Sequence, residues 1–190
     1  MAMPAQPTEW TVDMVRALPD DGNRYEVLGG ELFVTPAPSV FHQRAVRELL
    51  LLIDPYVRAH RIGEALMAPA DVVVYGPRKF VQPDLFVVPL VNGATPLAWE
   101  EVGRLLLVVE VISPSSRRTD RIDKRELYAR KGVPEYWIVD TDARTVERCR
   151  PNEAESEMLS GTIAWHPEPA VPPLVIDLPA YFDRVQVRAT

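Results

Sequence analysis

The segment LLLVVEVIS, residues 105–113, constrains the fold more than any other part of the sequence. It is a run of branched aliphatic residues that a single carboxylate, Glu110, interrupts. A continuous apolar run of this kind predicts a β-strand that is buried on both faces. An ionised carboxylate inside such a strand is costly unless a partner, a proton or a metal compensates the charge. The sequence therefore predicts that Glu110 has such a partner.

A second carboxylate occurs in a similar setting. The stretch FVQPDLFVVP, residues 80–89, places Asp84 directly after Pro83, near the start of another apolar strand. If the two strands are neighbours, Asp84 and Glu110 can converge at one edge of a sheet. Two carboxylates at close range repel each other, so one must hold a proton or a cation must lie between them. Oxygen ligands with no cysteine and few histidines favour magnesium or manganese over zinc.

Hydrophobic periodicity and turn residues predict a mixed α/β fold. Apolar runs with helical or strand spacing, separated by Gly- and Pro-containing turns, follow each other along the whole chain. The predicted elements are a short helix at 8–18, a hairpin at 24–36 around Gly29-Gly30, a helix at 41–60 that contains Pro55, strands at 65–75, 82–89, 105–112 and 135–140, a GPRK turn at 76–79, a helix at 120–131 before Gly132, and a weak strand at 174–178. This order predicts a mixed sheet with helices on its faces.

Composition favours a cytoplasmic globular protein. The 190 residues suffice for one domain with a full core, and 47% apolar and 25% charged content are ordinary values. No run approaches the roughly 18 apolar residues of a membrane span, and the N-terminal residues lack the pattern of a signal peptide. Cys149 is the single cysteine, which excludes a disulfide framework and a cysteine metal site.

The charge is unevenly distributed. A formal net charge of −6 argues against a general nucleic-acid coat protein. Residues 115–131, however, hold seven basic and three acidic side chains, which gives +4 locally and −10 for the rest. The basic residues are Arg117, Arg118, Arg121, Lys124, Arg125, Arg130 and Lys131. The cluster is either a solvated helix face or a surface that contacts phosphate groups.

The motifs around the two acids resemble a known superfamily. Asp84 after Pro83, Glu110 at the end of a strand and a lysine nearby are similar to the pattern of the PD-(D/E)XK nucleases. The stretches RYEVLGGELFVTPAPSVFHQ, VQPDLFVV, LLLVVEVISPSS and DRIDKRELYARKGVPEYWIVD resemble the Uma-type restriction-endonuclease-like family of bacteria. The resemblance covers about Tyr25 to Val146. It implies a single restriction-endonuclease-like domain over 1–190, with a core at about 24–147, an N-terminal β-hairpin and a C-terminal β extension at 148–190.

One position departs from the superfamily pattern. The lysine is expected two residues after the second acid, where this chain has Ile112. The family resemblance implies that the lysine has moved to the next helix, which points to Lys124. Asp120, Lys124 and Tyr128 are spaced i, i+4 and i+8, so they share one helix face. The alternative is an ordinary surface pair between Asp120 and Lys124.

The resemblance implies metal-dependent hydrolysis of phosphodiester bonds in DNA, with Mg²⁺ or Mn²⁺ as cofactor. Asp84 and Glu110 would hold the metal, with the carbonyl of Val111 as a further ligand, and Lys124 would orient water or neutralise charge. Further candidates are His42, as a phosphate or metal contact or as a capping or satisfied surface histidine, and Glu31, as an additional metal ligand. Glu26, a strand acid beside Glu31, is a candidate for the same role, and Glu48 is interpreted as a solvated helix acid.

The substrate and the assembly stay open at this point. If the basic cluster contacts DNA, the binding residues are Arg117, Arg118, Arg121 and Arg125. Two alternatives are an inactive interaction module of the same fold and a metal-dependent hydrolase of another phosphorylated substrate, which the acidic net charge favours. A homodimer that unites two basic surfaces is also expected, because two-fold dimers are the commonest symmetric oligomers.

Overall fold

The computed structural model describes residues 9–70, 73–74, 79–153 and 155–187. The middle of the predicted strand at 65–75 and most of the predicted GPRK turn lie outside these residues. The chain packs as two compact units, one of Met1–Pro38 and Pro69–Gln82 and one of Ser39–Ala68 and Pro83–Thr190. We call them unit 1 and unit 2 and describe each separately. A single domain over 1–190 stays a prediction.

Unit 1 is a small antiparallel sheet with one short helix. Its elements are α1 (Val12–Arg16), β1 (Arg24–Leu28), β2 (Glu31–Thr35), β4 (Val73–Val74) and β5 (Lys79–Val81), with strand order β2-β1-β5-β4. The predicted hairpin is confirmed, since β1 and β2 pair across Gly29 and Gly30. Both glycines have positive φ, 61° and 89°, which two-residue hairpin turns demand and which glycine adopts without strain.

Unit 2 contains a six-stranded mixed sheet. Its strands are β3 (Gly63–Met67), β6 (Leu85–Pro89), β7 (Leu107–Val111), β8 (Tyr136–Asp140), β9 (Thr145–Cys149) and β10 (Glu157–Leu159), in the order β10-β9-β8-β7-β6-β3. Only the β7–β8 pair is parallel among these neighbours. Every residue of β7 and β8 is buried, so the prediction that residues 105–112 form a strand buried on both faces is confirmed.

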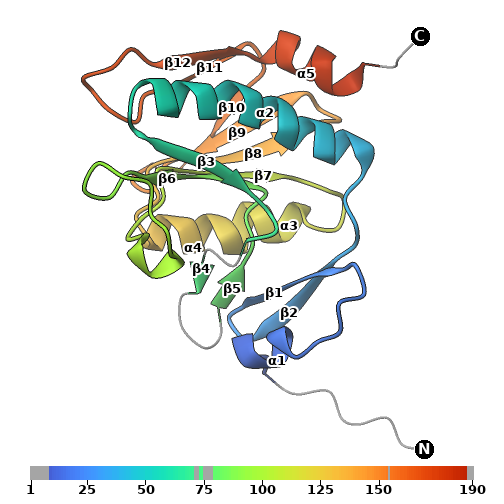
Figure 1. Ribbon diagram of the computed structural model, residues 1–190. Coiled ribbons are helices and arrows are strands. Elements are labelled where there is room, and N and C mark those ends of the chain that lie inside the picture. Colours follow the sequence, from blue (N-terminus) through green and yellow to red (C-terminus); the bar gives the residue numbers. More distant parts are fainter. Residues whose placement is uncertain (1–8, 71–72, 75–78, 154, 188–190) are drawn as a thin grey trace, which may run out of the picture. The chain divides into compact units, whose positions relative to one another are not determined.

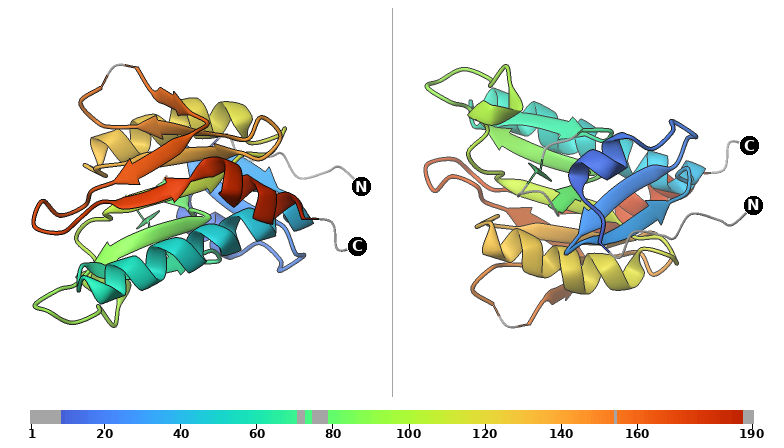
Figure 2. Two further views of the ribbon diagram at one scale, coloured as in Figure 1. Left: turned by 90° about the horizontal axis from the view of Figure 1, so that it is seen from above. Right: turned by 90° about the horizontal axis from the view of Figure 1, so that it is seen from below.

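Helices cover both faces of this sheet (Figures 1 and 2). Seen from above, α2 (Val40–Ala59) and α5 (Leu178–Gln186) lie over one face, and from below α4 (Arg125–Arg130) lies over the other. Two short segments precede α4, namely α3 (Arg117–Thr119) and the π-helical turn η2 (Asp120–Lys124). The 3-10 turn η1 (Trp99–Glu101) lies between β6 and β7 in the chain. The mixed α/β fold with helices on the sheet is thereby confirmed.

Two predicted elements differ from the structure. Residues 65–75 do not form one strand: β3 pairs with β6 in unit 2, whereas β4 pairs with β5 in unit 1. Pro69 lies between them and lacks the amide hydrogen that a strand ladder needs. The helix predicted at 120–131 begins earlier, at Arg117, and contains the π-helical turn. Gly132 does follow it, with a φ of 69°.

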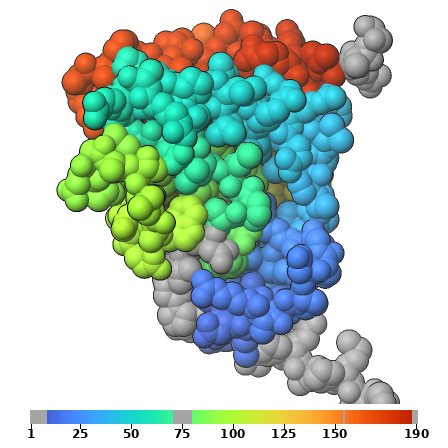
Figure 3. Space-filling view, viewed as in Figure 1, coloured from blue at the N-terminus to red at the C-terminus, as the bar shows by residue number. Residues whose placement is uncertain are grey.

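The C-terminal residues contribute to the main core of unit 2. The hairpin of β11 (Thr162–Trp165) and β12 (Leu174–Asp177) and the helix α5 supply Trp165, Tyr181 and Phe182, all buried in the cluster that α2 and the sheet also form. Helix α5 was not predicted, although its buried residues recur at helical spacing (Leu178, Tyr181, Phe182 and Val185) and Pro179 lies in its first turn, where proline is tolerated. Figure 3 shows α2 and the C-terminal segment side by side at the surface, and Tyr181 donates a hydrogen bond to the Ala45 carbonyl (3.1 Å).

Among the described residues, no helix combines the length and apolarity needed to cross a membrane.

Gly63 offers a test of the packing of the edge strand. A Cβ at this position would lie 2.0 Å from the backbone oxygen of Val88, which cannot move without breaking the β3–β6 pairing. We expect Gly63→Ala to lower the free energy of unfolding by about 1–3 kcal/mol or more, measured by denaturant titration. Gly161→Ala is the matched control, because nothing lies within 4 Å of its Cβ position. Equal stability of the two variants would contradict the described register.

The α2–α5 contact should make stability depend on pH. Glu48 is buried and bonded to Arg47 (2.6 Å) and Arg184 (3.1 Å), and these arginines hold its pKa below the ordinary value of 4.5. A lowered folded-state pKa stabilises the protein above about pH 4.5, and this contribution is lost as the pH falls through the folded-state pKa. We expect Glu48→Gln to cost about 1 kcal/mol at pH 7 and much less at pH 3, measured by thermal denaturation. A difference that does not change with pH would exclude this contribution.

Candidate active site

Asp84 lies one residue before β6 and is 3% exposed. Its Oδ2 accepts a hydrogen bond from the backbone N–H of Val111 (2.8 Å) and lies 3.0 Å from Nε2 of His42. Two separate elements, β7 and α2, therefore hold the same carboxylate oxygen. The prediction that Asp84 starts its strand is confirmed, and its neighbours include two of the predicted site residues.

His42 reaches Asp84 from the first turn of α2. Ser39 caps this helix, because its Oγ accepts a hydrogen bond from the His42 backbone N–H (3.2 Å). The cap fixes the first turn and directs the ring toward the sheet. The His42 side chain is 14% exposed, and its Nδ1 makes no hydrogen bond to any described residue. The interpretation of His42 as a capping residue is wrong, since Ser39 has that role and His42 contacts an acid.

Glu110 has the partners that its burial demands. It is 1% exposed, and its Oε1 accepts hydrogen bonds from Nζ of Lys124 (2.9 Å) and the hydroxyl of Tyr128 (3.2 Å). Lys124 is itself 2% exposed and lies 3.4 Å from Oδ1 of Asp120. The interpretation of Asp120 and Lys124 as a surface pair is wrong, because both are buried. Tyr128 does pack in the interior, and it also binds Glu110.

The segment from η2 to α4 carries these partners on one face. Asp120, Lys124 and Tyr128 follow at intervals of four residues, as the sequence predicts, and all three are buried. The backbone carbonyl of Asp120 accepts a hydrogen bond from the hydroxyl of Tyr136 on β8 (3.0 Å), which ties the π-helical turn to the sheet. Burial raises the pKa of Tyr136 well above its ordinary value, and the charge of Asp120 adds to this, so the hydroxyl stays a donor. Short π-helical segments often occur at functional sites.

The sheet register brings Asp84 and Glu110 to the same end of neighbouring strands. Leu85 pairs with Val109 in antiparallel β6 and β7, so continuation by one residue places Asp84 opposite Glu110. Within a strand the N–H and C=O of one residue point to the same edge. Because the N–H of Val111 binds Asp84, the carbonyl of Val111 lies on that edge too. The register thus places the two acids at the same strand end, with the Val111 carbonyl on the side of β7 that faces Asp84.

This donor set is compatible with magnesium. Among the described residues, no three or more His, Cys, Asp or Glu side chains lie close enough to form a protein-only metal cluster. Magnesium does not require one, since it usually binds one or two carboxylates and keeps several water molecules. All the available donors are hard oxygen atoms, which magnesium and manganese prefer.

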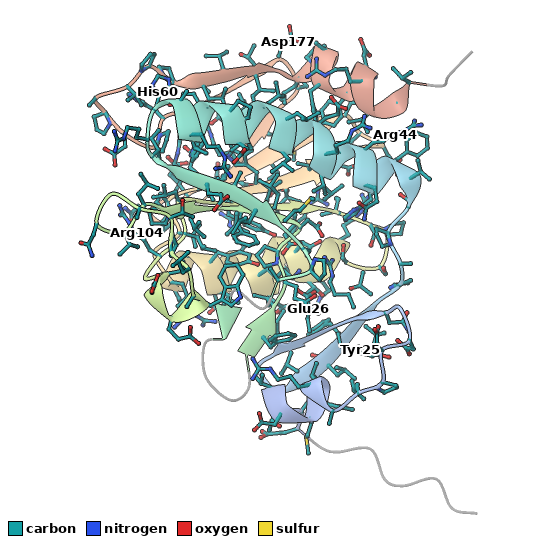
Figure 4. All side chains as sticks on the ribbon, in the orientation of Figure 1. Tyr25, Glu26, Arg44, His60, Arg104 and Asp177 are labelled. Carbon is teal, nitrogen blue, oxygen red and sulfur yellow. The ribbon has the colours of Figure 1, made fainter. Side chains whose placement is uncertain are left out.

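The other predicted acids belong to β1, β2 and α2. Glu31 is exposed on β2 of unit 1, opposite Leu28, and its role as a metal ligand stays a prediction. Glu26, on β1 of the same unit (labelled in Figure 4), is buried and accepts a hydrogen bond from the backbone N–H of Gln82 (2.8 Å). The interpretation of Glu48 as a solvated helix acid is wrong, because the residue is buried between Arg47 and Arg184.

The basic cluster is partly neutralised by acids from the sheet. Arg117 lies 3.5 Å from Oδ2 of Asp140 at the end of β8, and Nε of Arg121 donates to Oε2 of Glu147 on β9 (2.8 Å). The sequence does not identify these two acids, because they lie 23 and 26 residues after Arg117 and Arg121 and only the sheet brings them close. Arg118 is exposed.

Arg121 and Arg125 line a cavity of about 380 Å³, to which Tyr136 of β8 also contributes. Cys149 on β9 also lines it, and burial raises the pKa of this thiol to about 11, so it is protonated at neutral pH. Arg121 and Arg125 therefore face a different environment from Lys124, which points inward to Glu110. Their contact with DNA stays a prediction.

Comparison with known proteins identifies the fold and the family. A solved structure described as "a putative nuclease belonging to DUF820 from Anabaena variabilis ATCC 29413" matches with a TM-score of 0.69 and 21% identity, over 92% of this chain and 98% of the other. At that identity the match establishes a shared fold. A search of the curated proteins finds no match. The model of the Uma2 family, described as "Putative restriction endonuclease", matches residues 12–179. The chain therefore belongs to the Uma2 family of restriction-endonuclease-like proteins.

Proposed function

We propose that this protein is a divalent-metal-dependent endonuclease that hydrolyses phosphodiester bonds in DNA. The observation that carries the proposal is the buried carboxylate of Glu110, bonded to Lys124 and Tyr128, at the strand end where Val111 binds Asp84. A lysine beside two strand-end acids is the combination that such hydrolysis uses. Membership of a family of restriction-endonuclease-like proteins supports the same reaction.

Asp84, Glu110 and the carbonyl of Val111 would hold Mg²⁺ or Mn²⁺. The bound ion supplies Lewis-acid polarisation of the phosphate and lowers the pKa of a bound water molecule. Asp84 is suited to this role because Val111 and His42 fix its Oδ2, which limits the orientations of the carboxylate. A preorganised ligand loses less conformational freedom on binding.

Lys124 would stabilise the negative charge that develops at the phosphate, or orient the attacking water. Its ammonium is buried and hydrogen-bonded to Glu110, so it is already at the edge where the substrate phosphate would lie. A preorganised charge in a water-poor site stabilises a transition state more strongly than the same charge in water. Lys124 thus takes the place of the lysine that the superfamily pattern puts at Ile112.

Arg117 and Arg118 are the best candidates for contacts to the DNA backbone. Both belong to α3, which follows the end of β7 that carries Glu110. The Arg117 side chain is 48% exposed, and Asp140 lies 3.5 Å from it without burying it. Exposed guanidinium groups at the rim of an acidic site can bind the phosphates on either side of the reacting one.

Asp84→Asn should abolish metal-dependent cleavage of DNA while preserving the fold. Asparagine keeps the shape and the acceptor for the Val111 N–H but removes the charge. We expect a loss of activity on the order of a hundredfold or more, measured as nicking of supercoiled plasmid with Mg²⁺ or Mn²⁺. The same loss is expected for Glu110→Gln. Wild-type activity in either variant would exclude that residue from the reaction.

Glu135→Gln is the matched control for these variants. Glu135 is also a buried acid, but it precedes β8, and because β7 and β8 are parallel it lies at the opposite end of the sheet from Glu110. Glutamine can still accept the hydrogen bond from Nε1 of Trp137. This variant should cut DNA like the wild type. Absence of cleavage in the wild type itself would favour an inactive interaction module.

The salt dependence of DNA binding tests the proposed substrate. Each phosphate contact contributes a slope of about −0.9 to the plot of log affinity against log salt concentration. We expect a double variant, Arg117→Gln with Arg118→Gln, to make this slope shallower by about 1–2, measured by fluorescence anisotropy with duplex DNA. Arg104→Gln should leave the slope unchanged, because exposed Arg104 precedes the other end of β7 (Figure 4). A wild-type slope near zero would instead favour a small phosphorylated substrate.

The homodimer stays a prediction.

A further inference from the structure

The ammonium of Lys124 lies between two buried carboxylates. Its Nζ is 2.9 Å from Oε1 of Glu110 and 3.4 Å from Oδ1 of Asp120, and none of the three side chains is more than 2% exposed. An ammonium carries three donors, so it can contact both acids at once. The closer partner, Glu110, is on the sheet, whereas Asp120 is on the same π-helical turn as Lys124.

Glu110 cannot bind Lys124 and a divalent cation at the same time as strongly as it binds either one alone. Two cations on one carboxylate repel each other, and in a buried site this repulsion is only weakly screened. A lysine that lost its only carboxylate there would be left as an uncompensated buried charge, which is strongly destabilising. Binding of a metal at Glu110 therefore requires another anion close to Lys124.

Asp120 meets this requirement by its position. It is four residues before Lys124, and the hydrogen bond from Tyr136 to its backbone carbonyl holds this turn against β8. The distance between Asp120 and Lys124 is thus set within one helical segment and does not depend on the state of Glu110. The i, i+4 spacing keeps the two side chains on one face.

We propose that Asp120 is a positioning residue that keeps the Lys124 ammonium in the site when Glu110 binds a divalent cation. This inference rests on the proposed function, because it assigns Asp120 a role in the same metal site. Lys124 competes with the cation for Glu110, and Asp120 weakens this competition by sharing the ammonium. Asp120 acts through Lys124 and does not itself bind the metal.

The test is a double-mutant cycle on the affinity for Mn²⁺, measured by isothermal titration calorimetry on the full chain. Lys124→Met should tighten Mn²⁺ binding by about tenfold, because it removes the competing ammonium. Asp120→Asn should weaken binding by about tenfold, because Lys124 then interacts more strongly with Glu110. In the Lys124→Met background, Asp120→Asn should have no further effect. Circular dichroism confirms that each variant is folded.

Comparing the effect of Asp120→Asn on Mn²⁺ affinity with and without Lys124 distinguishes this role from a general effect of charge. Any buried carboxylate near the site attracts a divalent cation, and that attraction is the same with or without Lys124. Asp140→Asn provides this reference, since Asp140 is a buried acid at the end of β8 that pairs with Arg117. If Asp120→Asn weakens Mn²⁺ binding equally in both backgrounds, as Asp140→Asn should, the proposal is wrong.

A second measurement needs no metal. In the presence of EDTA, thermal denaturation is compared for Glu110→Gln, Asp120→Asn and the double variant. If the two acids share Lys124, the double variant loses more stability than the sum of the single losses, because each acid compensates for the other. Additive losses would contradict the proposal that Glu110 and Asp120 share the Lys124 ammonium. If the losses are non-additive but the protein binds no Mn²⁺, Asp120 is still the second carboxylate partner of Lys124. The metal site of the proposed function is then refuted.

Discussion

The buried contact between Glu110 and Lys124 is the interaction on which the arrangement of the site depends. A carboxylate in the middle of an aliphatic sheet is tolerated only with a charged partner and further hydrogen bonds. The chain supplies these from the segment that follows β7, where Lys124 and Tyr128 point back to the strand that precedes them. This requirement fixes which face of η2 and α4 carries the partners of Glu110, and Arg121 and Arg125 line a cavity beside β8 and β9 instead.

The order of the strands places the second acid. Because β6 and β7 are antiparallel, the start of one lies beside the end of the other, so Asp84 and Glu110 occur at one edge although 25 residues of chain separate them. The break at SPSS then leads into the helical segment that crosses the sheet face, and β8 returns parallel to β7. Residues at the ends of strands are commonly used for binding and chemistry in such sheets. The backbone N–H of Val111 joins the two acids, since it follows Glu110 and binds Asp84.

The remaining parts of unit 2 support this edge. Helix α2 carries His42 on its first turn, and α5 packs against that helix through Tyr181 and Arg184. Near the same end, Arg44 (labelled in Figure 4) donates a hydrogen bond to the Val187 carbonyl at 2.7 Å. The C-terminal segment therefore supports the helix that contacts Asp84. The family resemblance seen in the sequence covers residues only up to about Val146, so it does not indicate that the C-terminal segment supports α2.

The sequence by itself determined most of the strands, the two acids and the helix face that carries Lys124. Apolar runs with single interruptions identify Asp84 and Glu110, and the spacing of Asp120, Lys124 and Tyr128 identifies one helix face, because these features depend on residues close together in the chain. Only the tertiary structure decided that Asp120 is buried beside Lys124, that His42 and Val111 share Asp84, and that Asp140 and Glu147 neutralise part of the basic cluster. It also decided that residues 65–75 divide between two sheets and that α5 packs in the main core of unit 2. These contacts join residues that are distant in sequence or are set by burial, and hydrophobic periodicity carries no information about which distant partner a side chain will meet.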